Sequence, residues 1–314
     1  MKYHDQPHDE PLWSWPEHTG TYSLMGVLNV TPDSFFDGGA YYKLSDSSGR
    51  PSHKSLAGTR ANQLIDHAVN HALDMLKSGA KYIDVGGESS RPGAEAITLD
   101  EELARVIPVI EELSLRAPEA VISIDTVKPL VAQRALECGA KIINDINGLS
   151  DPQMRQVAAH YKAGVVIMHM RGVPKTMQEG DLSAADIVEE VWTWLHDAAN
   201  RALASSLTPA QIALDVGIGF GKTVEQNLSL LRGLGRFTKL GYPLLVGVSR
   251  KSMIGAITGA TTQDRLPGSL AAMIEARRRG GAIFRVHDVS ESAQALAVSE
   301  AISQNIDMFE IGSE

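Results

Sequence analysis

Two cations and two hydroxyl groups stand side by side in the run Ser249-Arg250-Lys251-Ser252. The run follows Leu-Leu-Val-Gly-Val, which is apolar enough to be a strand buried on both faces, as parallel strands are. The carboxyl ends of such strands are where α/β folds bind ligands, and this cluster suits an anion. The alternative interpretation is a solvated cap on a strand.

The same arrangement recurs along the chain, because every predicted strand ends in a polar or ionisable side chain. These residues are Asn29, Asp84, Asp125, Asn144 with Asp145, His169, Asp215, Lys251, and Arg285 with His287. A purely structural barrel has no need of such a set. Some members still have a structural interpretation: Asp84 and Asp145 as acceptors of backbone N–H bonds, and His169 as a residue that shapes the barrel mouth.

The residue types indicate a chemistry. Carboxylates only accept hydrogen bonds, so with Asn144 they suit a heterocycle with a donor edge, such as a pterin. Arg285 and His287 are two apart on one strand and point the same way. With Arg91 and Asn29 they suit a phosphate or a diphosphate. The alternatives are an ion pair of Arg285 with Asp288 or another buried acid, and a structural His287.

Strands and helices alternate through eight units, which predicts a single-domain (β/α)₈ barrel, with a doubly wound sheet as the alternative. The predicted strands are Ser23–Val30, 81–87, 120–126, 141–148, 165–170, 211–217, 244–249 and 282–288. The predicted helices are Ala61–Ser78, Leu99–Leu115, Pro129–Cys138, Asp151–Tyr161, a long helix to about Ser205, Val224–Leu234, Leu270–Arg279 and Ser290–Ser303.

Composition narrows the class of protein. The chain has 314 residues, 43% of them apolar, and a net charge of −9, which argues against nucleic-acid and anionic-membrane partners. The single cysteine, Cys138, suits a reducing cytoplasm. No apolar run reaches the length of a membrane span. Residues 1–20 are expected to form a loosely ordered extension that Trp13 and Trp15 pin to the barrel, and residues 21–314 form the barrel.

Nine motifs occur in a fixed order: MGVLNVTPDSFFDGG, YIDVGGESSRPGA, SIDTVKP, INDING, VIMHMRGVPKTMQ, GFGK, VGVSRKSMIG, RLPGSLA and FRVHDV. From about Ser23 to about Val298 the chain therefore resembles the dihydropteroate synthases. The resemblance implies a TIM barrel that condenses 6-hydroxymethyl-7,8-dihydropterin diphosphate with 4-aminobenzoate in an SN1-like, Mg²⁺-assisted reaction. It also implies a homodimer and a sulfonamide target.

The resemblance further implies roles for individual residues. The groups acting on the reaction are Asp125, Lys251, Arg285 and His287, and Asn29 is the Mg²⁺ ligand. The substrate-binding residues are Asn144, Asp215, Met168, Gly219, Phe220, Ser90, Arg91, Pro92 and Ser252. Loops after the first two strands are expected to close over the substrates.

The chain departs from the family pattern at a few positions. Ser90 replaces a threonine, Val216 replaces a proline, and Ile218 replaces an aromatic residue that we expect near the aminobenzoate, where it would affect KM and sulfonamide affinity. Residues 40–59 lengthen the first loop. The competing functions are a pterin-binding methyltransferase, a non-catalytic pterin-binding paralogue and a scaffold barrel; the paired Ser-Arg-Lys-Ser and Arg-Val-His elements disfavour them.

Overall fold

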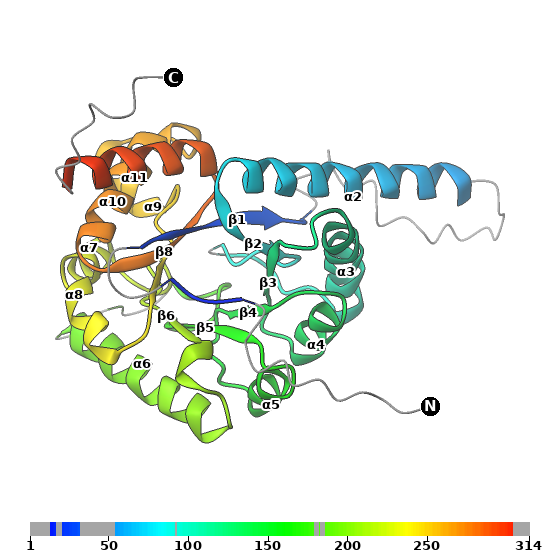
Figure 1. Cartoon of the computed structure of the whole chain (residues 1–314). Helices are drawn as coiled ribbons and strands as arrows, with labels where there is room; N and C mark the ends of the chain where they lie inside the picture. Colours follow the sequence, from blue (N-terminus) through cyan, green and yellow to red (C-terminus); the bar gives the residue numbers. More distant parts are fainter. Residues whose placement is uncertain are drawn as a thin grey trace, which may run out of the picture.

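The computed structural model describes residues 13–16, 21–31, 54–91, 93–178, 182 and 186–303, with side chains in the first helix from residue 62 onward. Eight parallel strands close into a barrel in chain order, and the last strand pairs with the first. Helices surround the barrel (Figure 1). The predicted (β/α)₈ architecture is confirmed, and the doubly wound alternative is wrong.

The strands are β1 (Ser23–Asn29), β2 (Ala80–Gly86), β3 (Val121–Asp125), β4 (Ile142–Asp145), β5 (Gly164–Met168), β6 (Ile212–Asp215), β7 (Leu244–Val246) and β8 (Gly281–Val286). The helices are α2 (Lys54–Lys77), α3 (Leu99–Arg116), α4 (Pro129–Glu137), α5 (Pro152–His160), α6 (Ile187–Ala204), α7 (Val224–Arg232), α8 (Leu234–Phe237), α9 (Ser252–Thr258), α10 (Leu266–Arg278) and α11 (Val289–Ser303). None of the described helices combines the length and apolar composition of a membrane span.

Helix starts follow local capping chemistry. The Thr98 hydroxyl accepts the Glu101 N–H at 3.2 Å at the start of α3. Two predicted starts are wrong. Helix α10 begins at Leu266 because a proline in its first turn loses no hydrogen bond. Helix α2 begins at Lys54, seven residues early, so 54–59 belong to this helix and not to a longer loop; residues 40–53 lie outside the described residues.

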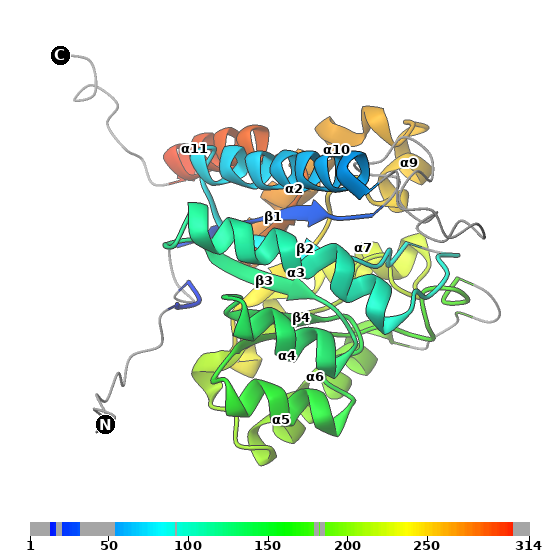
Figure 2. The ribbon, with the colours of Figure 1, turned by 90° about the vertical axis from the view of Figure 1, so that its right-hand side faces the viewer.

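The inside of the barrel has an apolar base. Met25, Tyr82, Ile142 and Leu245 pack there with Trp13 and Trp15, which are 7% and 9% exposed. The Trp15 Nε1–H donates to the Gln211 carbonyl at 3.1 Å, and Ser14 accepts the Tyr82 hydroxyl at 2.7 Å. Figure 2 shows this segment, in blue at the left, at the end of the barrel where the strands begin. Trp13 and Trp15 therefore anchor the segment as expected, while the domain boundary at residue 21 stays a prediction.

A polar layer lies above the apolar base. Side chains two residues further along a strand point the same way, so the inward direction of Tyr82, Ile142 and Ile283 carries over to Asp84, Asn144 and Arg285. The register pairs Met168 with Asp215, and Asp125 with Asn144. The barrel thus brings polar residues from five strands, β2, β3, β4, β6 and β8, together at the carboxyl ends of the strands.

Candidate active site

Arg285 is the centre of the polar layer. Its guanidinium donates from Nε to Asp84 Oδ2 at 2.6 Å and from Nη2 to Asp125 Oδ2 at 2.7 Å. Asn144 Nδ2 donates to the same Asp84 oxygen at 2.9 Å. The arginine fork therefore holds two carboxylates from adjacent strands in fixed positions, a geometry that a lysine could not reproduce. Of the alternative partners considered, Asp288 pairs with Arg250, whereas the expected ion pair of Arg285 with another buried acid is present as its contact with Asp84.

The Asp125 carboxylate is tuned by this arrangement. Burial raises its pKa, Arg285 opposes that shift, and the nearby Asp84 carboxylate adds to it. Asp84 is fully buried, and its second oxygen has no hydrogen-bond partner among the described residues. The prediction that Asp84 accepts backbone N–H groups is wrong, because its partners are side chains; Asp145 does accept the N–H groups of Asn147 and Leu149.

Lys251 and Asp215 form the second charged part of the cavity. The Asp215 Oδ1 accepts the Gly217 N–H at 2.7 Å, which leaves its other oxygen to the cavity. Lys251 Nζ lies 4.2 Å from the centre of the Phe220 ring. Burial lowers the pKa of Lys251 to about 8 against the opposing Asp215 carboxylate. A side chain on Gly219 would meet the Lys251 stem at 3.1 Å, so the glycine leaves room for the lysine.

His287 is a neutral group rather than a cation. Its Nδ1 lies 3.0 Å from Ser249 Oγ, which also accepts the His287 backbone N–H. In the tautomer that carries the ring proton on Nε2, the serine hydroxyl is the donor to Nδ1. Burial and the charge of Arg285 lower the pKa of His287 to about 4. The ring can donate one hydrogen bond to an anion, but it adds no charge near pH 7.

Lys222 is a structural residue of the site that the sequence did not single out. It is 3% exposed and donates to the carbonyls of Gly217, Phe220 and His169 at 2.9, 3.0 and 3.2 Å. Three carbonyls match the three donors of an ammonium. The contacts fix the loop that carries Phe220. The sequence signal that could have marked Lys222 is its position directly after Gly-Phe-Gly.

His169 and Met168 are both buried near the end of β5. His169 is 3% exposed and packs edge-on against Trp194 of α6 at 5.1 Å, which supports a structural rather than a catalytic role. Burial lowers the pKa of His169 to about 3. Met168 is 3% exposed at the end of β5. Asn29 ends β1, and its Oδ1 and the Asp125 carboxylate flank Gly86, 3.8 and 3.6 Å from where a Cβ would lie.

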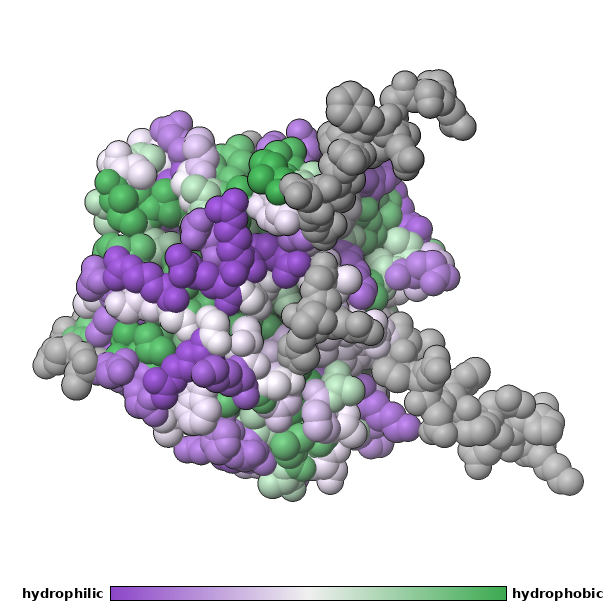
Figure 3. Space-filling model, turned by 60° about the vertical axis from the view of Figure 1, so that its left-hand side comes forward, coloured by the Kyte–Doolittle hydropathy of each residue, from purple (hydrophilic) through white to green (hydrophobic). Residues whose placement is uncertain are grey.

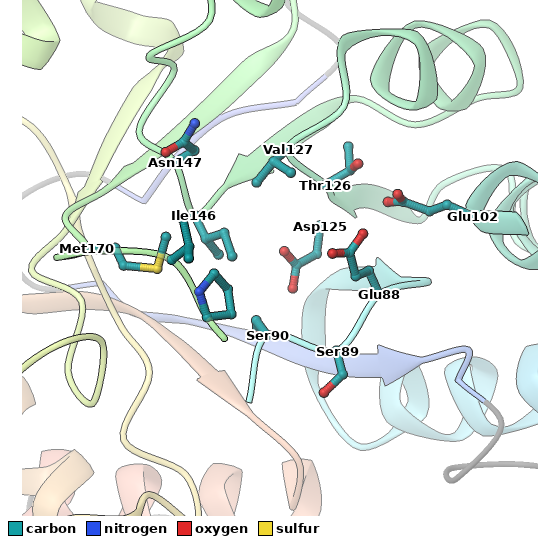
Figure 4. A pocket seen from close by; sticks show the side chains of 12 residues that line it. Glu88, Ser89, Ser90, Glu102, Asp125, Thr126, Val127, Ile146, Asn147 and Met170 are labelled. Carbon is teal, nitrogen blue, oxygen red and sulfur yellow. The ribbon is translucent and has the colours of Figure 1, made fainter. Parts of the chain in front are cut away.

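A cavity of about 150 Å³ opens beside Asp125 under the loop between β2 and α3. Ser89 and Ser90 lie at one edge, with Ile146 and Met170 at another (Figure 4). The sequence did not single out these two apolar residues, since nothing in the strand-end pattern marks them. Other predicted residues lie apart from this polar cluster: Arg91 and Ser252 are exposed, and Pro92 lies outside the described residues.

Ile218 does not border the site. It is 1% exposed and packs, with Val216, in the outer core between barrel and helices. Gly217 and Gly219 have φ of 68° and 85°, so the chain reverses at both and the Ile218 side chain turns away from the cavity. This placement argues against the expected contact of Ile218 with aminobenzoate, whereas the ring of Phe220 lies beside Lys251.

Comparisons with known proteins agree with this geometry. A family model described as Pterin binding enzyme matches residues 50–287. The dihydropteroate synthase of Escherichia coli (strain K12) is 45% identical over 278 residues, covering 88% of this chain and 90% of that protein. That of Synechocystis sp. is 40% identical over 298 residues, 94% of each.

Solved structures agree as well. The dihydropteroate synthase of Xanthomonas albilineans with 4-aminobenzoic acid has a TM-score of 0.77 at 37% identity, covering 90% of this chain and 93% of that one. A Yersinia pestis dihydropteroate synthase in a sulfonamide drug complex has a TM-score of 0.79 at 38% identity, covering 90% and 95%. The resemblance in the sequence motifs is confirmed. The chain belongs to the pterin-binding enzyme family, among the dihydropteroate synthases.

Proposed function

We propose that the cavity condenses 6-hydroxymethyl-7,8-dihydropterin diphosphate with 4-aminobenzoate, giving 7,8-dihydropteroate and pyrophosphate. The observation that carries this is the Arg285 fork, which joins Asp84 and Asp125 beside Asn144 at the mouth of the barrel. The related Xanthomonas albilineans enzyme has been solved with 4-aminobenzoic acid and with 7,8-dihydropteroate, which supports both halves of the site.

The pterin half uses acceptors that are left over from the internal network. Asn144 donates to Asp84, so its carbonyl oxygen stays available, and Asp215 keeps one oxygen for the ligand. These acceptors, with the Asp125 carboxylate, suit the N–H-rich edge of a pterin. Met168 packs against the ring. Because Arg285 and the Gly217 N–H already hold the carboxylates, they do not reorganise when the ring binds.

Bond cleavage needs charge stabilisation rather than a strong base. The methylene C–O bond breaks, the diphosphate leaves with the electron pair, and positive charge spreads into the pterin ring near Asp125. The aminobenzoate amine then forms the C–N bond and loses one proton. Lys251, Arg285 and Arg91 supply positive charge for the departing diphosphate, and His287 Nε2–H supplies a neutral donor.

The residues present fit a Mg²⁺ ion at the diphosphate. Among the described residues no group of three or more His, Cys, Asp or Glu side chains could hold a metal. Mg²⁺ commonly binds through one or two protein oxygens together with substrate phosphates and water, and the Asn29 oxygen faces the cavity beside Asp125. When bound, the ion would neutralise charge on the leaving diphosphate. Calorimetry tests this, since Mg²⁺ should bind with pyrophosphate present and not without it, and Asn29→Ala should weaken that binding.

The aminobenzoate half lies under the loop between β2 and α3. As the family resemblance implies, we infer that Ser90 and Arg91 of that loop border the aminobenzoate together with Phe220, Lys251 and Ser252; Pro92 has the same implied role but lies outside the described residues. Closure of the loop excludes water, which would otherwise hydrolyse the carbocation-like pterin.

Pyrophosphate release from purified protein tests the function. With pterin diphosphate, Mg²⁺ and aminobenzoate the protein should release one pyrophosphate per dihydropteroate formed, and Asp125→Asn should lower turnover by about 10²–10³-fold. A methyltransferase would bind a methylated folate instead, and a non-catalytic paralogue would bind pterin diphosphate without turnover. Either result refutes the proposal.

We also infer a cytosolic homodimer. Val298 and Ile302 on α11 are 60% and 69% exposed, and apolar patches lie between hydrophilic residues on the face that Figure 3 brings forward. Burial of such side chains against a second copy would stabilise a dimer. Light scattering of the wild type and of Val298→Lys tests the inference, since the variant should shift the equilibrium to monomer.

A further inference from the structure

Two cations hold the base of the loop between β2 and α3. Arg105 of α3 donates from Nη1 to the Gly87 carbonyl at 2.7 Å. Lys128, directly before α4, contacts the Glu88 carboxylate with its ammonium and donates to Glu102 Oε2 at 2.5 Å. The loop is therefore tied to both neighbouring helices before it reaches its substrate-facing residues.

These contacts are largely shielded from water. Lys128 and Glu88 are 22% and 23% exposed, and Glu102 is 1% exposed. The second oxygen of Glu102 has no hydrogen-bond partner among the described residues. Removing one partner of a buried ion pair leaves the charge of the other uncompensated. Lys128 therefore stabilises both Glu88 and Glu102.

The loop passes so close to α3 that its path has little freedom at Gly87. A Cβ there would lie 2.8 Å from Val106 Cγ1 and 3.1 Å from Glu102 Cγ. Further along, the Gly93 N–H donates to the Pro174 carbonyl at 3.1 Å. Ser90 and Arg91 lie between these two ties, so a shift of Glu88 would be passed on to them.

Figure 4 shows the carboxylates of Glu88, Glu102 and Asp125 on one side of the cavity and Ser90 below them. Aminobenzoate is an anion. Without a compensating cation, Glu88 would repel it and would be repelled by Asp125, so it would swing the loop outward. Lys128 supplies that cation and does not itself line the cavity.

We propose that Lys128 is a positioning residue: by holding Glu88 and Glu102 it fixes the β2–α3 loop where Ser90 and Arg91 border aminobenzoate. The inference rests on the proposed function. It predicts that Lys128 acts on aminobenzoate binding and not on binding of the pterin ring, since Arg285 and the Gly217 N–H hold the carboxylates that face the ring.

Lys128→Met tests this by a split between the two substrates. KM for aminobenzoate should rise roughly 10- to 100-fold, the range that a small misplacement of a binding group produces. The dissociation constant for 6-hydroxymethyl-7,8-dihydropterin, which lacks the diphosphate assigned to Arg91, should stay within about twofold of the wild type when measured by calorimetry without aminobenzoate. Lys128→Arg keeps the charge and should restore most of the aminobenzoate affinity. Glu88→Ala removes the loop side of the contact and leaves no acceptor for Lys128, so it should also raise the aminobenzoate KM even if Lys128→Met fails to fold.

Lys175→Met is the matched control. Lys175 pairs with Glu95 on the same loop at 3.3 Å, but the two side chains are 65% and 83% exposed, so its loss should leave both constants unchanged. The proposal is overturned if folded Lys128→Met or Glu88→Ala binds aminobenzoate like the wild type, or if aminobenzoate and the hydroxymethyl pterin weaken equally. Failure of the proposed function would differ, because the wild type itself would then release no pyrophosphate.

Discussion

Ile218 and Phe220, both in the loop after β6, should control different properties. Ile218 should set the free energy of unfolding, and Phe220 should set the KM for aminobenzoate. Ile218 is 1% exposed in the outer core, where Ile218→Ala leaves a cavity. The free energy of unfolding should fall by about 2–5 kcal/mol, the range for truncating a buried aliphatic side chain. The KM for aminobenzoate should stay within about twofold of the wild type, because no part of the side chain reaches the cavity.

Phe220→Ala should have the opposite result. Its ring lies 4.2 Å from Lys251 Nζ and is only partly buried. Loss of a cation–ring contact is worth about 0.5–2 kcal/mol, which corresponds to roughly a 2- to 30-fold rise in KM. The free energy of unfolding should fall less than in Ile218→Ala, because less apolar surface leaves the core.

Urea unfolding and steady-state kinetics on the two variants provide the measurement. Aminobenzoate is varied at saturating pterin diphosphate, and Ile218→Val, which removes one methylene, should cost only about 0.5–1.5 kcal/mol. A tenfold change in aminobenzoate KM for Ile218→Ala with unchanged stability would refute the reasoning and restore the expectation drawn from the sequence.

Three further outcomes are expected. Because burial lowers the pKa of Lys251 to about 8, its charge is present below that pH and lost above it, so kcat/KM should fall as pH rises through 8, and Lys251→Arg should remove this alkaline limb from the pH profile. Trp15→Ala should lower the free energy of unfolding by about 3–5 kcal/mol in urea with kcat unchanged, since Trp15 lies at the far end of the barrel. Lys222→Met should lower kcat/KM by roughly tenfold or more through displacement of the Phe220 loop, a loss that pyrophosphate-release kinetics would detect.

The fold could be predicted because the barrel repeats one local rule. Each strand is a short apolar run, and inward residues alternate, so the polar ends of eight strands had to meet at one mouth. Helix starts were less predictable. Residues 54–60 lack apolar periodicity, so nothing in the pattern marks the first two turns of α2.

The residues of the site could be predicted more easily than the contacts that they make with one another. Arg285 contacts Asp84 across 201 positions of sequence and Asp125 across 160, and several acids were equivalent candidates by type. The position of Ile218 near aminobenzoate was expected from the family pattern alone. The alternation of a strand does not apply in this loop, because positive φ at Gly217 and Gly219 reverses the chain on either side of Ile218. Lys222 was not predicted because its partners are backbone carbonyls. Lys128 was not predicted because its partners, Glu88 and Glu102, lie on a neighbouring loop and helix.

The positively charged side chains of the site already lie beside carboxylates before substrate binds. Arg285 serves two carboxylates, Lys251 faces Asp215, and His287 is neutral. This network holds the donors rigid, so they need not reorganise as the diphosphate departs, but it also leaves little uncompensated positive charge at the base of the cavity. Arg91, which is exposed on the β2–α3 loop, lies outside this network and can add positive charge to the leaving group. The position of the β2–α3 loop then sets both aminobenzoate binding and departure of the diphosphate.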